Sequence, residues 1–248
     1  MQVAINTDFV AKRKRMYRRT TLGYFLLFVI AFLTTFLYPN LAFIAWPLLV
    51  IAFVVSNLSR QIQFETGVPV TTEDRLERAL KPLSQRYWLG SYVPVGRLFV
   101  DHMLIGPEGV LVIEPRNHTG ATKYVGGKWR RRTGIVTRLL GIEPSIGNPV
   151  RDLNGLVDVV RTDLEQAGLG DVPVSGALVF TATGSRLELE DCPVTALTIA
   201  QLSAWASSHQ LKGDADMAER LRHRLVSHYA ERLPGQTALE SRAVRTSS

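Results

Sequence analysis

Two acidic residues are predicted to meet across a β-hairpin. Asp101 lies in the run GRLFVDHMLI and Glu114 in VLVIEPRN, and GPEG at residues 106–109 turns the chain between them. If Gly106 pairs with Gly109, the antiparallel register continues until Asp101 stands opposite Glu114. Opposed side chains lie about 4.5–5.5 Å apart, and like charges there are destabilising. A bound divalent cation would remove that repulsion, because hard cations prefer carboxylate oxygens.

Basic residues follow this hairpin. Arg116 shares a strand face with Glu114, since side chains two apart point the same way. From Arg116 to Arg138 the chain has no acidic residue, and aromatic side chains stand among the basic ones. That composition suits a phosphate backbone with unstacked bases, although a solvated or lipid-facing hairpin edge has it too. The residues expected to bind nucleic acid are Lys123, Lys128, Trp129, Arg130, Arg131 and Arg132.

Two uncharged runs near the N-terminus predict membrane-spanning helices. Residues 21–38 and 41–58 each provide about 27 Å of helix, close to the ~30 Å hydrocarbon core of a bilayer. Only Pro39 and Asn40 separate them, so we expect a tight helical hairpin in contact with the lipid bilayer. The alternatives are a cleaved signal peptide or a buried core helix.

The charges around these runs predict the orientation. Six basic residues and one acid precede the first run, and the turn between the runs is uncharged. By the positive-inside rule the N-terminus is cytoplasmic, and a second span returns the chain to that side. We therefore expect a two-pass protein of a bacterial-type inner (plasma) membrane, with both termini and the soluble domain in the cytoplasm. The single cysteine, Cys192, excludes an intrachain disulfide and agrees with that compartment.

The rest of the chain is long enough for one domain with its own core. Helical periodicity begins near Thr71 and recurs at 148–166, 198–209 and 214–233, and strand-like runs occupy 96–105, 110–114, 128–136, 172–181 and 192–197. This order predicts an α/β fold, a mixed sheet with helices on its faces. The expected segments are a basic cytoplasmic arm (1–20), two transmembrane helices (21–58), a connector (59–70), the α/β domain (71–233) and a disordered tail (234–248).

The order and spacing of several motifs between about Thr72 and Phe180 resemble the nuclease-related domain family, NERD, of the restriction-endonuclease-like PD-(D/E)xK superfamily. Glu73 stands where that family usually has a glutamate in its first helix. The other residues that carry the resemblance are Asp101 and His102, GPEGVLVIEPRN at 106–117, Gly120, Trp129, NPV at 148–150 and GALVFT at 176–181. The resemblance implies a restriction-endonuclease-like mixed sheet flanked by helices, here following a transmembrane helical hairpin.

The resemblance also implies roles for single residues. Asp101, Glu114 and the backbone carbonyl of Pro115 would hold Mg²⁺ or Mn²⁺, and the residue at Arg116 would orient the attacking water. With Glu73 these residues form the implied catalytic set. The implied activity is metal-dependent cleavage of DNA or RNA at the cytoplasmic face of the membrane.

Three residues depart from the family pattern. Arg116 replaces a lysine and cannot act as a base, Pro115 removes a hydrogen bond from its strand, and Asp152 stands where glutamine is common. Two classes of function therefore remain open: a nuclease, and an inactive nuclease-fold module that binds nucleic acid or protein at the membrane. Oxygens of Asp101 and Glu114 within reach of one metal ion would favour the nuclease. An ion pair from Arg116 to either acid would favour the module.

Overall fold

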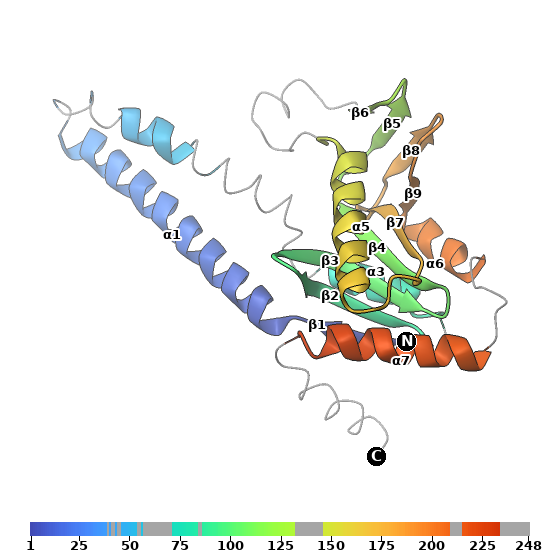
Figure 1. Cartoon of the computed structure of the whole chain (residues 1–248). Coiled ribbons are helices and arrows are strands. Elements are labelled where there is room, and N and C mark those ends of the chain that lie inside the picture. Colours follow the sequence, from blue (N-terminus) through green and yellow to red (C-terminus); the bar gives the residue numbers. More distant parts are fainter. Residues whose placement is uncertain are drawn as a thin grey trace, which may run out of the picture. The chain divides into compact units, whose positions relative to one another are not determined.

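The computed structural model describes residues 1–38, 46–53, 71–83, 86–131, 146–208 and 215–233, together with residues 40, 43 and 56. The chain divides into two compact units, drawn in Figure 1. The first unit comprises Met1–Asp8, Val70–Arg132 and Ile146–Ser248, and the second comprises Phe9–Pro69 and Thr133–Ser145.

A six-stranded mixed sheet forms the centre of the first unit. Its strand order is β1-β2-β3-β4-β7-β9, so β4 is an inner strand. The middle strands β2, β3 and β4 are antiparallel, whereas β1, β7 and β9 pair in parallel with their neighbours. The strands are β1 (Gln2–Ile5), β2 (Trp88–Val95), β3 (Leu98–Gly106), β4 (Gly109–Arg116), β7 (Val174–Phe180) and β9 (Thr195–Thr198). The predicted mixed α/β architecture is confirmed.

Helices cover both faces of this sheet. α5 (Pro149–Gln166) and α7 (Ala215–Ala230) pack against one face, where Val110 and Val112 of β4 belong to the same buried cluster. α3 (Thr71–Leu80) and α6 (Ile199–Ser208) pack against the other face, which Leu111 and Ile113 share. Alternate residues of β4 thus belong to opposite clusters, as the two-residue period of a strand requires. Glu114, two residues after Val112, lies on the α5 face.

A three-stranded sheet, in the order β6-β5-β8, adjoins the main core. Its strands are β5 (Ala121–Val125), β6 (Lys128–Arg131) and β8 (Arg186–Leu189). Trp129 of β6 packs with its ring centroid 5.7 Å from that of Phe180 in β7, which joins the two sheets. The strand expected at 128–136 ends at Arg131 as far as the described residues extend.

The strand β1 lies in the segment for which the sequence indicated a basic arm. It pairs in parallel with residues 88–91 of β2, and its Ala4 is 2% exposed in the main core. Asn6, which alone separates β1 from the following helix, is also buried. The expected arm at 1–20 therefore differs from the structure, because a four-residue strand carries almost no periodic signal and forms here by pairing with a distant segment.

The second unit contains α1 (Thr7–Leu37), a helix of 31 residues and about 46 Å. Its first half carries the six basic residues, and its second half is apolar and largely exposed, with Phe25, Phe32 and Phe36 all more than half exposed. By length and composition α1 is able to cross a membrane. Of the second expected span, residues 46–53 are helical and the rest falls mainly outside the described residues, so a two-helix hairpin is not established. The connector at 59–70 and the tail at 234–248 also lie outside them.

Candidate functional site

The acidic hairpin has the predicted register. Ile105 pairs with Val110 and Gly106 with Gly109. The ladder between β3 and β4 ends at His102 and Ile113, one pair before Asp101 and Glu114. Past that point β4 continues only along β7, where Pro115 still has a partner. Pro115, which has no N–H to donate, therefore follows the end of the β3 ladder. The two acids lie where that ladder stops.

The guanidinium of Arg116 lies between two carboxylates. Its Nη2 is 3.3 Å from Oε1 of Glu114 and 2.7 Å from Oδ2 of Asp152. Asp152 is in the first turn of α5, which begins with Asn148 as N-cap and Pro149 in the first turn. The side chains of Arg116 and Glu114 are only 15% and 13% exposed, so water screens this contact little. Two of the three departures from the family pattern thus contact each other directly.

The environment of Glu114 favours its neutral form. Burial raises the pKa of Glu114 to about 7, and the charges of Asp101 and Asp152 act in the same direction. Arg116 opposes the shift but does not cancel it. Glu114 is therefore affected by the charges of two further carboxylates, Asp101 and Asp152, as well as by that of Arg116.

Glu73 is held by the neighbouring strand β2. The hydroxyl of Tyr92, in β2, donates a short hydrogen bond to Oε1 of Glu73. Oε2 of Glu73 is buried and accepts no hydrogen bond from the described residues. The pairs on either side, Ser91 with His102 and Val93 with Val100, place Tyr92 opposite Asp101. Tyr92 thus connects the first turn of α3 to the strand position that carries Asp101.

The backbone of Tyr92 is unusual and is supported by β1. Tyr92 has φ +57°, a left-handed conformation that is rare for a residue with a bulky side chain. Its carbonyl accepts a hydrogen bond of 3.2 Å from Nδ2 of the buried Asn6. Sequence reasoning missed both residues, since neither a glycine nor a turn motif marks this position. A sparsely populated conformation of this kind persists only where the surroundings fix it.

The basic segment contributes fewer free cations than its sequence predicts. Lys123 forms an ion pair with Glu188 of β8, and Arg131 donates two hydrogen bonds to the carbonyl of Thr119. Lys128 and Arg130 are exposed and make no ion pair within the described part of the chain. Arg132 lies outside it. The rings of Tyr124 and Trp129 pack together with centroids 5.1 Å apart, so Trp129 faces the core rather than solvent.

One family of known proteins matches a segment that contains the hairpin, Glu73 and the start of α5. Residues 70–181 match the nuclease-related domain family, NERD. The match spans α3 to β7 and leaves β1 and α1 outside it. No curated protein and no solved structure matches the chain. The resemblance inferred from the motifs is thus confirmed for this domain.

The residues of the matched segment fit a divalent cation poorly. Arg116 occupies Oε1 of Glu114, an oxygen that the expected ion would need. Across the described ranges, no three Asp, Glu, His or Cys side chains gather closely enough to hold a metal. His102 does not join the acids: its Nδ1 lies 2.9 Å from Oγ of Ser91, and burial lowers the pKa of His102 to about 3, which keeps it neutral.

Proposed function

We propose that the nuclease-related domain binds the phosphate backbone of nucleic acid at a membrane and does not cleave it. The contact of Arg116 with Glu114 and Asp152 carries this proposal. A guanidinium recognises carboxylates and phosphates with the same paired N–H groups, but it cannot accept a proton from water. Arg116, held between two carboxylates, therefore argues against hydrolysis, and the phosphate contacts are assigned to other basic residues.

The outer face of the small sheet supplies the binding surface in this proposal. Cross-strand partners share a face, and Lys123 pairs with Arg130, Val125 with Lys128, and Ala121 with Arg186. The four basic side chains are exposed, and Glu188 is the acid that faces them within β8. Contacts of this kind bind phosphates without reading base sequence.

A metal-dependent nuclease is the second candidate, and the raised pKa of Glu114 favours it. The charges of Asp101 and Asp152 raise the pKa of Glu114, and a divalent cation bound beside these carboxylates would relieve that repulsion. To admit one, Arg116 would have to leave Glu114 and remain with Asp152 alone. Such an enzyme would bind its DNA or RNA substrate through the same basic face of the small sheet.

Binding and cleavage are separable in one assay. The full chain in detergent or nanodiscs is incubated with labelled single- and double-stranded DNA and RNA, with Mg²⁺, Mn²⁺ or a chelator. We expect binding that weakens steeply with salt, because phosphate contacts release counterions, and no metal-dependent cleavage. Cleavage that requires metal and is lost in both Asp101→Ala and Glu114→Ala would establish the second candidate instead. Cleavage that survives both substitutions would indicate a contaminating nuclease.

We further propose that the chain crosses the membrane twice. The support is the pairing of β1, which precedes α1, with β2, which follows the apolar segments. Two strands that pair with each other lie on the same side of a membrane. If α1, which lies between them in the chain, crosses the membrane once, the chain must cross it a second time before β2. Residues 41–58 are the segment suited to it by composition. Cleavage of α1 as a signal peptide would also remove β1 from the sheet.

Labelling in intact cells tests this topology. In a Cys192→Ser background, single cysteines are placed at the exposed positions Asp8 and Arg220, on opposite sides of the apolar segments. A membrane-impermeant maleimide should label neither until the membrane is opened. Labelling of only one of them from outside would be incompatible with two crossings.

A further inference from the structure

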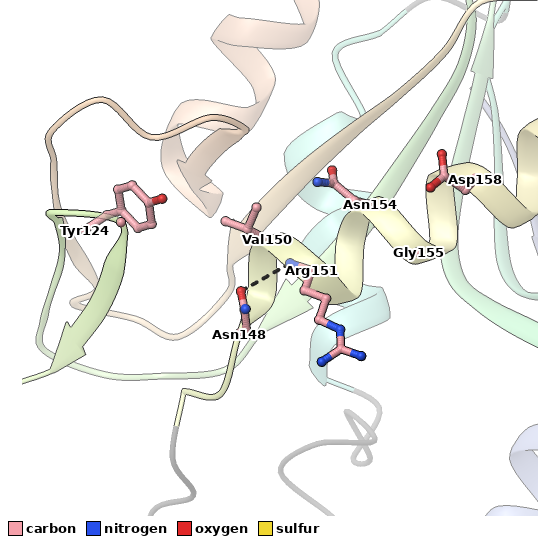
Figure 2. A pocket seen from close by; sticks show the side chains of 8 residues that line it. Tyr124, Asn148, Val150, Arg151, Asn154, Gly155 and Asp158 are labelled. Carbon is pink, nitrogen blue, oxygen red and sulfur yellow. Dashed lines mark hydrogen bonds between the residues drawn. The ribbon is translucent and has the colours of Figure 1, made fainter.

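A hollow of about 570 Å³ lies between the β5–β6 hairpin and the first turns of α5. Figure 2 shows Tyr124 on one side of it and the start of α5 on the other. Its lining residues are Tyr124 and Gly127 from the hairpin, and Asn148, Val150, Arg151, Asn154, Gly155 and Asp158 from the start of α5. None of these residues takes part in the cluster around Arg116.

Gly155 is the residue that packing does not explain. A glycine inside a helix costs about 1 kcal/mol relative to alanine. A Cβ at Gly155 would meet no atom within 4 Å. By contrast, a Cβ at Gly176 would lie 2.9 Å from Leu153, so close packing of α5 on β7 demands that glycine. Gly155 instead keeps the wall of the hollow free of a side chain.

The polar groups on the helical wall are available to a ligand. Arg151 and Asn154 are exposed, and their side chains make no hydrogen bond or ion pair within the described ranges. The other two polar side chains are used within the protein: Oδ1 of Asn148 accepts from the Arg151 amide, and Asp158 pairs with Arg161 at 2.8 Å. What remains is a guanidinium, an amide and the edge of Tyr124.

We propose that this hollow holds one nucleotide of a single strand, an inference that rests on the proposed binding of nucleic acid. The guanidinium of Arg151 suits a phosphate, and the amide of Asn154 suits the polar edge of a base. A base reaches such a recess only when it is unstacked and unpaired. Lys128 and Arg130, one and three residues after Gly127, then meet the neighbouring phosphates on the outer face of β6.

Filling the hollow tests the proposal. The full chain in nanodiscs of neutral lipid is titrated with a labelled single-stranded oligonucleotide and with the matching duplex, at several salt concentrations. Gly155→Leu should weaken single-strand binding about tenfold, as loss of one base contact does, and leave duplex binding and the salt slope unchanged. Gln166→Leu is the control, because it adds the same side chain at an exposed position of the same helix.

Removing the charge of Arg151 gives a second, independent readout, the salt dependence of binding. Arg151→Ala should lower the salt slope for the single strand by about 0.7, which corresponds to one phosphate. Arg78→Ala removes another exposed cation, on α3 across the sheet, and should leave the slope unchanged. Thermal midpoints confirm that each variant is folded.

Failure of the nucleotide site and failure of the proposed function give different results. If the wild type binds and Gly155→Leu binds the single strand equally well, the nucleotide site is wrong while the proposed function stands. If the wild type shows no salt-dependent binding to any nucleic acid, the proposed function is wrong and the nucleotide site with it.

Discussion

At the scale of single residues, the contact between Arg116 and Asp152 changes what the site is able to do. Each substitution alone departs from the family pattern, yet in the structure they form one ion pair with 2.7 Å between Nη2 and Oδ2. Arginine reaches a second carboxylate because its guanidinium presents several N–H groups in a plane. Arg116 thereby stays beside Glu114 as a fixed cation.

Glu114→Gln is expected to remove a pH dependence of stability. The pKa of Glu114 is raised from 4.5 to about 7 by burial, so the folded protein holds this proton more tightly than the unfolded chain. The stabilisation from this bound proton is complete below about pH 4.5 and is lost as the pH rises through about 7. The free energy of unfolding changes by about 3 kcal/mol over that range. Thermal midpoints measured across that range should fall in the wild type and fall less in the variant. If the thermal midpoints of the wild type and the variant fell equally with pH, the pH dependence would not come from Glu114.

At the scale of elements, Asp163 fastens α7 to α5. It accepts hydrogen bonds from His228 at 3.0 Å and from Arg232 at 2.8 Å. Burial alone would raise the pKa of Asp163, but these bonds and charges outweigh it and lower the pKa. The stability that ionised Asp163 supplies is therefore present above about pH 4, the pKa of a free aspartate. It is lost as the pH falls through the lowered pKa of Asp163.

Asp163→Asn should loosen α7. Replacing this partly buried, paired carboxylate is expected to cost about 1–3 kcal/mol, since hydrogen bonds to charged groups are the strong ones. Amide exchange in α7 should quicken relative to that in α5. Asp158→Asn is the control, because its pair with Arg161 lies on the exposed side of α5 and is worth about 0.5 kcal/mol. Equal effects of the two substitutions would refute the fastening role.

The strand β1 supports the left-handed residue beside the acids. Asn6→Ala removes the buried hydrogen bond to the carbonyl of Tyr92, at a cost of about 1 kcal/mol, the usual net contribution of such a bond. Exchange of amides in β2 near Tyr92 should quicken, whereas the exposed Asp8→Ala should have no effect. Unchanged protection in Asn6→Ala would mean that Tyr92 keeps its conformation without β1.

At the scale of the whole molecule, the apolar segments interrupt the domain along the chain rather than preceding it. β1 lies before α1, and every other element of the sheet lies after the apolar segments (Figure 1). Without β1 the edge of β2 would expose unpaired N–H and C=O groups, a template for aggregation. The matched family segment at 70–181 therefore lacks a strand that this chain supplies from its N-terminus.

A soluble version of the domain should require that strand. Residues 1–8 joined by a flexible linker to residues 70–233 are expected to give a monomer with cooperative unfolding. Residues 70–233 alone should aggregate or unfold at a lower temperature, because the β2 edge and the place of Ala4 in the core are left open. Size-exclusion chromatography and thermal unfolding compare the two. Equal stability would show that β1 is dispensable.

The sequence by itself determined the features that depend on local pattern. The turn at 106–109 set the hairpin register, the NPV segment set the start of α5, and composition set the apolar half of α1. Such features follow from turn geometry, helix capping and hydrophobicity, each of which acts within a few residues. The same motifs were enough to indicate the nuclease-related domain.

Tertiary structure alone decided the remaining features, which depend on segments far apart in the chain. Arg116 meets an aspartate 36 residues later, and Asn6 meets a carbonyl 86 residues later. Trp129 turned toward Phe180 because burying the ring stabilises it more than exposure on a basic surface. No local periodicity encodes these contacts, since they exist only after the sheet has brought its strands and helices together. One of them, the contact of Arg116 with Asp152, holds a guanidinium beside Glu114.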